Sequence, residues 1–255
     1  MNWDIPIGQL IAIFLGAARA GAWLMLCPPF NSRLIPAQVK VLLSIGISLP
    51  MAPYLTSAVP VIETSAIIAA TALQVFVGAA LGFITLLLFA AVQAAGDLLD
   101  VFGGFTLASA YDPLSQNQSS VFGRFYNLVA VTLLFASGGH QLVLRGFMES
   151  YKTLPLDASF SMETFNKLLI EGVGEMFVSA LQIAGPLIAV LFLTDVAFGL
   201  LNRVAPALNA FQLGFPAKIF LVLTLAGTAI AILPKALETL VNHAVSAVVH
   251  LSGGG

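Results

Sequence analysis

The sequence has little charge, since only 9% of its 255 residues are Asp, Glu, Lys or Arg. Soluble globular domains carry about 25% charged residues, and a chain of this length would need a polar shell around the core that it buries. Hydrophobic residues make up 59% of the sequence, so that shell cannot be built. The shortage of charge excludes an ordinary soluble protein and predicts apolar surface that faces lipid or other apolar subunits.

The sequence also has little net charge and few cysteines, and each shortage excludes a class of site. The formal net charge is −2, so no basic field could neutralise phosphates, and no nucleic-acid partner is expected. The single cysteine, Cys27, rules out an intrachain disulfide and a multi-cysteine metal site, and its expected role is that of a small buried hydrophobe. The sequence has no glycine-rich phosphate loop, serine elbow or zinc-binding histidine pair. It therefore predicts neither an enzyme nor a cofactor or metal.

Long apolar stretches follow one another along the whole chain. A helix needs roughly 20 apolar residues to span a bilayer, and the third and fifth stretches exceed that length. We therefore predict an all-α, multi-pass integral membrane protein, a single domain over residues 1–255 made of kinked helical hairpins. The six stretches cover residues 5–29, 41–59, 65–96, 127–147, 173–201 and 219–234.

A seventh stretch, 236–251, mixes leucine and valine with polar residues such as Glu238 and Asn242. Its spacing predicts a separate amphipathic helix with one apolar stripe. Such a helix could lie on a membrane surface or pack on a partner, and packing is the favoured interpretation.

Glycine and proline residues inside the stretches predict kinks or close contacts. Gly78 and Gly82 are four residues apart, a spacing that allows a close helix contact or a bend. Proline removes a backbone hydrogen bond from a helix, so a kink is predicted at Gly185-Pro186. Pro206 and Pro216 are further predicted kink sites.

Two charged residues lie deep in apolar surroundings. Placing arginine at a helix centre in lipid costs about 2.5–3.5 kcal/mol, so Arg19 either pairs with an acid of this chain or of a partner, or extends to the membrane interface. Asp195 precedes Arg203 by eight residues, about 12 Å along a continuous helix, and each is expected to find a different partner. Structural pairing of Asp195 is favoured over a proton relay.

Asp97 and Asp100 lie three residues apart and therefore share one helix face. No metal ligand or nucleophile accompanies the two carboxylates. A helix end that emerges into water is the expected explanation for both.

The segment that follows combines aromatic residues with glycine. Gly103-Gly104 lies between Phe102 and Phe105, and Asp112-Pro113 predicts a turn. Non-helical backbone at membrane depth persists only when it is buried in protein or lines a water-filled cavity. The segment could therefore form a pore-lining plug, and an interfacial helix with an aromatic belt is the alternative.

Several separated motifs occur in a characteristic order. They begin with Pro-Pro-Phe-Asn-Ser-Arg at 28–33 and continue with Phe-Thr-Leu-Ala-Ser-Ala-Tyr-Asp-Pro at 105–113 and Gly-Arg-Phe-Tyr-Asn-Leu at 123–128. The most specific runs over 195–219 and ends in Leu-Gly-Phe-Pro-Ala-Lys-Ile. Together these motifs resemble the FliR/SctT family of type III protein-export gate subunits, and the last one favours the flagellar branch over the injectisome branch.

The resemblance implies a structural subunit of the flagellar export gate in the bacterial inner membrane, within the basal body and raised toward the periplasm. With FliP and FliQ it would form the channel through which unfolded rod, hook and filament proteins pass. The implied partners are FliP-like, FliQ-like and FlhB-like subunits, the unfolded substrates and membrane lipid. Residues 1–200 would resemble FliP, and residues 201–251 a FliQ hairpin.

The resemblance also implies roles for individual residues. A pore plug is implied at Phe102, Gly103, Gly104, Phe105, Leu107 and Tyr111. An inter-subunit or buried polar role is implied at Arg19, Arg124, Asp195, Arg203, Asn209 and Lys218. Two alternatives remain: an injectisome export-gate subunit, and a small secondary transporter that uses Asp195 and Arg203 at a broken helix. Inverted repeats, which the transporter would predict, are not evident in the sequence.

Overall fold

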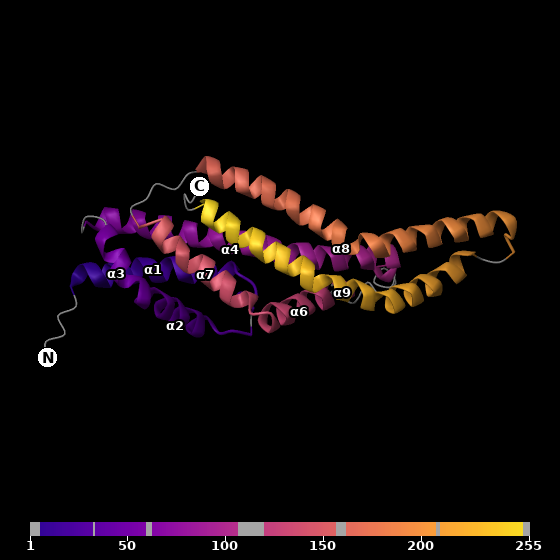
Figure 1. Ribbon diagram of the computed structural model, residues 1–255, viewed down its shortest axis with the longest axis horizontal. Coiled ribbons are helices and arrows are strands. Elements are labelled where there is room, and N and C mark those ends of the chain that lie inside the picture. Colours follow the sequence, from indigo (N-terminus) through magenta and orange to yellow (C-terminus); the bar gives the residue numbers. More distant parts are fainter. Residues whose placement is uncertain are drawn as a thin grey trace. The chain divides into compact units, whose positions relative to one another are not determined.

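The computed structural model describes residues 6–32, 34–59, 63–106, 120–156, 162–207 and 210–251. Over these ranges the chain is helical without any strand, which confirms the predicted all-α class (Figure 1). The long helices are α1 (Ile7–Leu26), α2 (Ala37–Ser48), α4 (Thr64–Gly103), α6 (Val121–Ala136), α7 (Gly139–Thr153), α8 (Met162–Val204) and α9 (Ala210–Leu251). Short turns continue α2, namely η1 (Leu49–Met51), α3 (Ala52–Leu55) and η2 (Thr56–Ala58).

The described helices are long and apolar enough for several membrane crossings, so the predicted multi-pass class is confirmed. Four spans qualify by length and composition, and the number rises to six if each of two bent helix pairs counts as one span. The four are Ile7–Leu26, Ala37–Ala58, Thr64–Gly103 and Met162–Val204, and the bent pairs are Val121–Ala136 with Gly139–Thr153 and Gln212–Gly227 with Ile230–His243.

Three of the predicted stretches have different boundaries in the structure. The fourth is broken between α6 and α7, where Gly138 has a φ of +74°, a conformation open to glycine because it has no Cβ. The sixth and seventh belong to one helix, α9, which continues through Pro216 and Pro234. The predicted separate amphipathic helix is therefore wrong. Part of its apolar stripe packs within the chain, since Leu240 and Val241 are buried.

The described residues group into two compact units, each assembled from separate parts of the sequence. Helices α4, α8 and α9 contribute residues to both units. The division into a FliP-like part and a FliQ-like hairpin near residue 200 stays a prediction. Unit 1 comprises Met1–Leu88, Ser137–Val173 and Leu240–Gly255, and unit 2 comprises Phe89–Ala136 and Gly174–Thr239.

Unit 1 is organised around α1, against which α4 packs with almost no space between the backbones. A Cβ at Gly78 would overlap the carbonyl oxygen of Arg19, and one at Gly82 would lie 3.0 Å from that of Trp23. The pair of glycines thus gives the close helix contact that small residues permit in membrane proteins. On another side of α1, the Trp23 ring stacks on Phe147 of α7 with ring centroids 4.4 Å apart.

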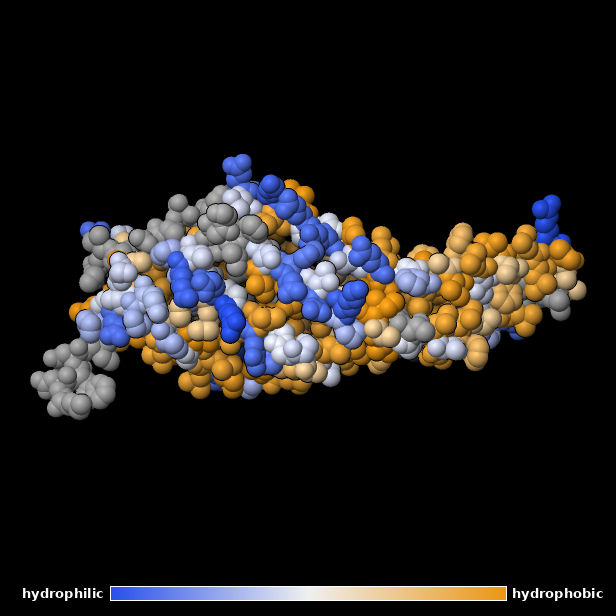
Figure 2. Space-filling model, viewed as in Figure 1, coloured by the Kyte–Doolittle hydropathy of each residue, from blue (hydrophilic) through white to orange (hydrophobic). Residues whose placement is uncertain are grey.

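Helix α2 turns its small polar residues inward and its large apolar residues outward. Ser44 and Ser48 are buried, and Ser48 lies opposite Gly16 of α1. By contrast, Leu42 is 69% exposed. Because lipid is as apolar as leucine, membrane helices associate through small residues, and α2 follows this pattern. Apolar residues also cover much of the surface that Figure 2 shows.

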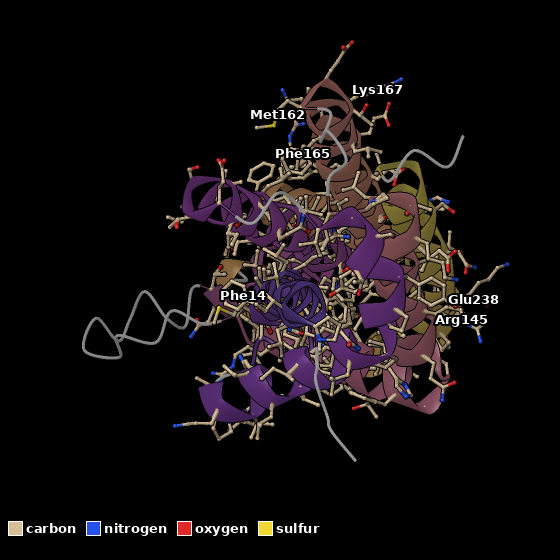
Figure 3. All side chains as sticks on the ribbon, turned by 90° about the vertical axis from the view of Figure 1, so that its left-hand side faces the viewer. Phe14, Arg145, Met162, Phe165, Lys167 and Glu238 are labelled. Atoms are coloured by element: carbon tan, nitrogen blue, oxygen red, sulfur yellow. The ribbon has the colours of Figure 1, made fainter. Side chains whose placement is uncertain are left out.

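The first turns of α8 carry side chains of two kinds. Phe165 packs edge-on against Phe76 of α4, with ring centroids 5.5 Å apart. Figure 3 labels Phe165 together with Met162 and Lys167 of the same helix, and both of these are exposed. This start of α8 therefore holds to unit 1 through an aromatic contact and leaves its charged side chains outside.

Candidate functional site

Arg19 is completely buried, and three of its N–H groups donate to oxygens of other helices or their ends. Its Nε donates to Oε1 of Gln74 at 2.7 Å, Nη1 to the main-chain oxygen of Ser150 at 3.0 Å, and Nη2 to that of Leu154 at 2.8 Å. An extension to the membrane interface is therefore wrong. The other interpretation expected Arg19 to pair with an acid. In these three hydrogen bonds the acceptors are neutral oxygens instead.

The neutral acceptors suit a cation because of their position at the end of α7. Ser150 lies in the last turn of that helix, and Leu154 follows its final residue. The last carbonyl groups of a helix lack partners within it and carry the negative end of the helix dipole. The Arg19 guanidinium also lies 4.9 Å from the ring centroid of Tyr151, whose hydroxyl donates to Gly16 at 2.7 Å. The end of α7 thus substitutes for a counter-ion.

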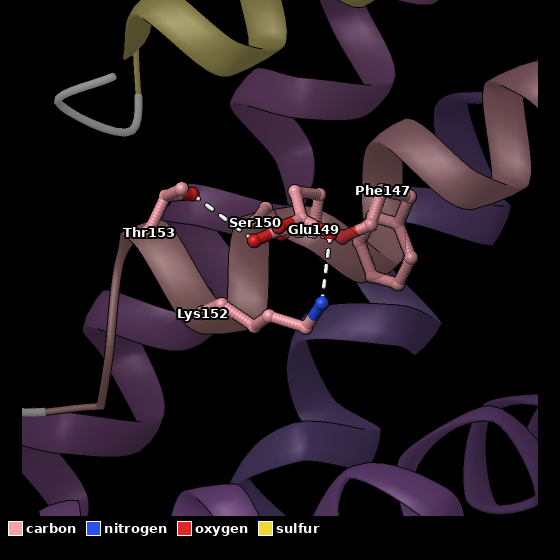
Figure 4. Close-up of polar contacts among 5 residues, drawn as sticks. All are labelled: Phe147, Glu149, Ser150, Lys152 and Thr153. Atoms are coloured by element: carbon pink, nitrogen blue, oxygen red, sulfur yellow. Dashed lines mark hydrogen bonds and ion pairs between the residues drawn. The ribbon is translucent and has the colours of Figure 1, made fainter.

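Other carbonyl groups in the last turns of α7 are bonded by that helix's own side chains (Figure 4). Ser150 Oγ donates to the oxygen of Phe147 at 2.6 Å, and Thr153 Oγ1 donates to that of Glu149 at 3.1 Å. The Glu149 carboxylate pairs in turn with Lys152 on the exposed side, at 3.1 Å. The oxygen of Ser150 accepts the Leu154 N–H at 3.0 Å as well as Nη1 of Arg19, and the oxygen of Leu154 accepts Nη2.

Asp100, near the end of α4, is a second buried charge. It is 1% exposed, so the expectation that it lies at a helix end in water is wrong. Its Oδ2 accepts hydrogen bonds from the Ser120 hydroxyl and, at 3.0 Å, from the Phe122 N–H. Both donors lie at the start of α6, where free N–H groups and the positive end of the dipole favour an anion. Ser120 caps the same helix by accepting from the Gly123 N–H at 2.8 Å.

Close backbone contact between α4 and the start of α6 accompanies the Asp100 bonds. A Cβ at Gly96 would overlap the Phe122 carbonyl, and one at Gly123 would overlap the Asp97 carboxylate. Sequence reasoning included Gly123 in a motif but assigned no role to Gly96 or Ser120. The available signals were a glycine one turn before the acid in a helix and a serine directly before the apolar run of α6.

The predicted plug residues lie in part at the end of α4, in unit 2. The helix ends at Gly103, and Gly104 takes a φ of +85°, which allows its N–H to bond to the Val101 oxygen at 3.3 Å. The Phe105 ring packs edge-on against Phe122, with centroids 5.2 Å apart. Phe102 is half-buried. Leu107 and Tyr111 lie outside the described residues, and the plug role stays a prediction.

The remaining predicted polar residues are distributed over unit 2. Asp195 of α8 pairs with Lys218 of α9, in keeping with the expectation that Asp195 and Arg203 have different partners. Arg203, in the last turn of α8, is exposed, and so is Arg124 of α6. Asn209 lies outside the described residues.

Some of the predicted kink sites lie inside α8 or α9, and one follows the end of a helix. The structure continues α8 through Gly185-Pro186 and α9 through Pro216. Pro206 follows the end of α8 at Val204. A kink at any of these positions stays a prediction.

Cys27 follows the end of α1 and is fully buried, as expected of a small hydrophobe. Burial raises the pKa of its thiol, because a thiolate would lose its hydration there. Among the described residues, no three His, Cys, Asp or Glu side chains come together as metal ligands would. The hydrogen bonds of Arg19 and Asp100 join helices of this chain to one another.

Comparison with known proteins gives matches over nearly the whole chain. The family described as bacterial export proteins, family 1, matches residues 10–244. The flagellar biosynthetic protein FliR of Pectobacterium carotovorum subsp. carotovorum is 31% identical over 242 residues, which are 95% of this chain and 92% of that protein. FliR of Escherichia coli K12 is 31% identical over 91% of this chain and 88% of its own length. The secretion system apparatus protein SsaT of Salmonella typhimurium is 32% identical over 59% of this chain and 58% of its length.

Proposed function

The chain belongs to family 1 of the bacterial export proteins, and from this membership we propose that it forms an export channel with FliP-like and FliQ-like subunits. It is an integral membrane subunit of a flagellar, type III export apparatus. We propose further that the channel lies in the bacterial inner membrane, is raised toward the periplasm, and passes unfolded rod, hook and filament proteins. An FlhB-like subunit is the proposed contact on the cytoplasmic side. The proposed role is structural, without catalysis.

The observation that carries the proposal is the apolar surface that unit 2 leaves uncovered. Large side chains of α8 and α9 remain more than half exposed, including Leu193 at 65%, Leu200 at 60% and Phe220 at 68%. Monomeric soluble proteins rarely expose large apolar patches, which mark protein or membrane contacts. The ion pair of Asp195 with Lys218 lies between the same two helices and joins them. This surface suits contact with apolar helices of other subunits or with lipid.

Extraction in mild detergent tests the proposed assembly. The chain is expected to co-purify with FliP-like and FliQ-like subunits. Replacing Leu193 and Leu200 with glutamate places two charges on the uncovered face of α8 and is expected to abolish co-purification. The matched control is Lys167→Glu, at an exposed site in the first turns of the same helix. Isolation of the unaltered chain as an active monomer would contradict the proposal.

The plug assignment has its own test. We propose that the aromatic residues Phe102, Phe105 and Tyr111 close the resting channel. Their combined replacement by alanine is expected to let small ions leak through the assembled gate, measured as conductance in vesicles. Phe14→Ala, at an exposed position on α1, serves as the control. An assembled triple variant without added leak would count against the assignment.

A further inference from the structure

We infer that Asp100 is a positioning residue for Phe105 and acts through Phe122. Asp100 lies on α4 five residues before Phe105, and Phe122 lies in the first turn of α6. The inference rests on the proposed function only where it assigns Phe105 a role in closing the channel. The geometry of the three residues is independent of that role.

The first link is the pair of hydrogen bonds at the Asp100 carboxylate. Oδ2 accepts the N–H of Phe122 at 3.0 Å and the hydroxyl of Ser120. Oδ1 is buried and has no hydrogen-bond partner among the described residues, so the carboxylate depends on what Oδ2 accepts. A buried carboxylate without such donors is strongly unfavourable. The start of α6 is therefore fixed to α4 at this point.

The second link is the ring contact. Phe122 is 6% exposed, and its ring meets Phe105 edge-on with centroids 5.2 Å apart and planes at 66°. Edge-on contacts between aromatic rings are favourable beyond the area that they bury. Because its N–H is held by Asp100, Phe122 offers Phe105 a fixed surface.

The backbone leaves little room for an alternative arrangement. The Phe122 carbonyl lies so close to Gly96 that no side chain fits between them. On the other side of Asp100, the φ of +85° at Gly104 ends α4 and redirects the chain immediately before Phe105. The ring of Phe215 lies 3.2 Å from the site of a Cβ on Gly104. Asp100, Gly96 and Gly104 thus define where the Phe105 ring can lie.

Cross-linking tests the positioning without reference to export. With Cys27 replaced by serine, the cysteine pair Phe105→Cys and Phe122→Cys is expected to be joined readily by a short bifunctional thiol reagent, which reports how the start of α6 lies against the end of α4. Adding Asp100→Ala is expected to slow cross-linking at least tenfold, because the start of α6 is released. Val101→Ala is the matched control, at an exposed position of the same helix, and is expected to leave the rate unchanged. Equal rates with and without Asp100→Ala would overturn the inference.

Ion leak then links the positioning to the channel. Asp100→Ala is expected to leak as much as Phe105→Ala, and the double variant no more than either, since both disturb one ring. A double variant that leaks as the sum of the two would overturn the inference. If cross-linking slows but neither single variant leaks, the proposed plug fails while the positioning stands.

A variant that does not assemble is replaced by a milder change at Ser120. Ser120→Ala removes one donor to Asp100, whereas Ser120→Thr keeps the hydroxyl. The alanine variant is expected to slow the cross-link and the threonine variant to restore it. Equal cross-linking in the two variants would again contradict the role of Asp100.

Discussion

Nη2 of Arg19 in α1 donates to the main-chain oxygen of Leu154, 135 residues further along the chain, at 2.8 Å. This bond joins a buried cation to the C-terminal end of α7. The buried anion of Asp100 has the opposite relationship, since it accepts from the N-terminal end of α6. In each case the partial charge of a helix end faces a full charge of opposite sign. The two charges thus need no ion-pair partner in apolar surroundings.

Replacement of Arg19 by methionine is expected to destabilise the chain severely. The change leaves Oε1 of Gln74 and the main-chain oxygen of Leu154 without the Arg19 donor, and each buried acceptor left unsatisfied costs roughly 1–3 kcal/mol. Arg19→Lys keeps the charge but not the planar fork, and is expected to restore only part of the stability. Thermal unfolding of the purified chain in detergent measures the effect. Arg145→Met, at an exposed site on α7, is the control, and an equal loss there would contradict the argument.

Gly78→Ala is expected to disrupt the packing of α4 on α1. The new Cβ would overlap the carbonyl oxygen of Arg19, and backbone cannot move aside as a flexible side chain can. Gly46→Ala provides the contrast, because nothing lies within 4 Å of its Cβ position. In a helix interior alanine is about 1 kcal/mol more favourable than glycine, so Gly46→Ala should stabilise the isolated chain. Unfolding temperatures of the two variants check the difference, and a tolerated Gly78→Ala would exclude the close contact.

Cys27 is expected to resist thiol reagents until the chain unfolds. Maleimide labelling should stay slow between pH 7 and 9 in the folded chain, because the thiol is buried and its pKa is raised. Ser57→Cys, at an exposed position in η2, should label quickly as a control. Rapid labelling of Cys27 in the folded chain would contradict its burial.

The raised thiol pKa also predicts a pH dependence of stability. Above about pH 8.5 the unfolded chain loses the Cys27 proton while the folded chain keeps it. The free energy of unfolding should therefore fall as pH rises above that value. Below it the contribution of Cys27 is fully present. Cys27→Ala should remove this part of the pH dependence, measured by unfolding at pH 7 and at higher pH.

The ion pair of Asp195 with Lys218 is expected to contribute modestly to the contact between α8 and α9. The Asp195 side chain is 49% exposed and that of Lys218 18%, and solvent-exposed pairs contribute about 0.2–1 kcal/mol. Asp195→Asn and Lys218→Met should each lower the unfolding temperature slightly, and the double variant by less than the sum. Double-mutant analysis measures this coupling. Additive losses would show that the pair contributes nothing.

Most of the fold could be predicted from the apolar runs and from the spacing of the glycines. The break between α6 and α7 was missed because Gly138 lies inside a run that remains apolar on both sides. The sixth and seventh stretches were separated because Pro234 is a helix breaker in local terms, although α9 continues through it.

The candidate site was less accessible to sequence reasoning than the fold. The motif around Phe105 indicated the region, but two carboxylates three residues apart predict exposure as readily as burial. The difference depends on Ser120 and Phe122, whose position next to Asp100 is a tertiary property. For Arg19, the acceptors are main-chain oxygens, which every residue possesses, so no pattern of side chains could reveal them.

The ribosome completes Arg19 long before the main-chain oxygens that satisfy it exist. The acceptors at Ser150 and Leu154 lie 131 and 135 residues downstream. At about 5–20 residues per second, they are synthesised about 7–27 s after Arg19. During this interval α1 carries a charged side chain whose placement in lipid is energetically unfavourable. The hydrogen bonds of Arg19 to the end of α7 can therefore form only after α7 has been made, so the packing of α1 is completed by a segment synthesised more than a hundred residues later.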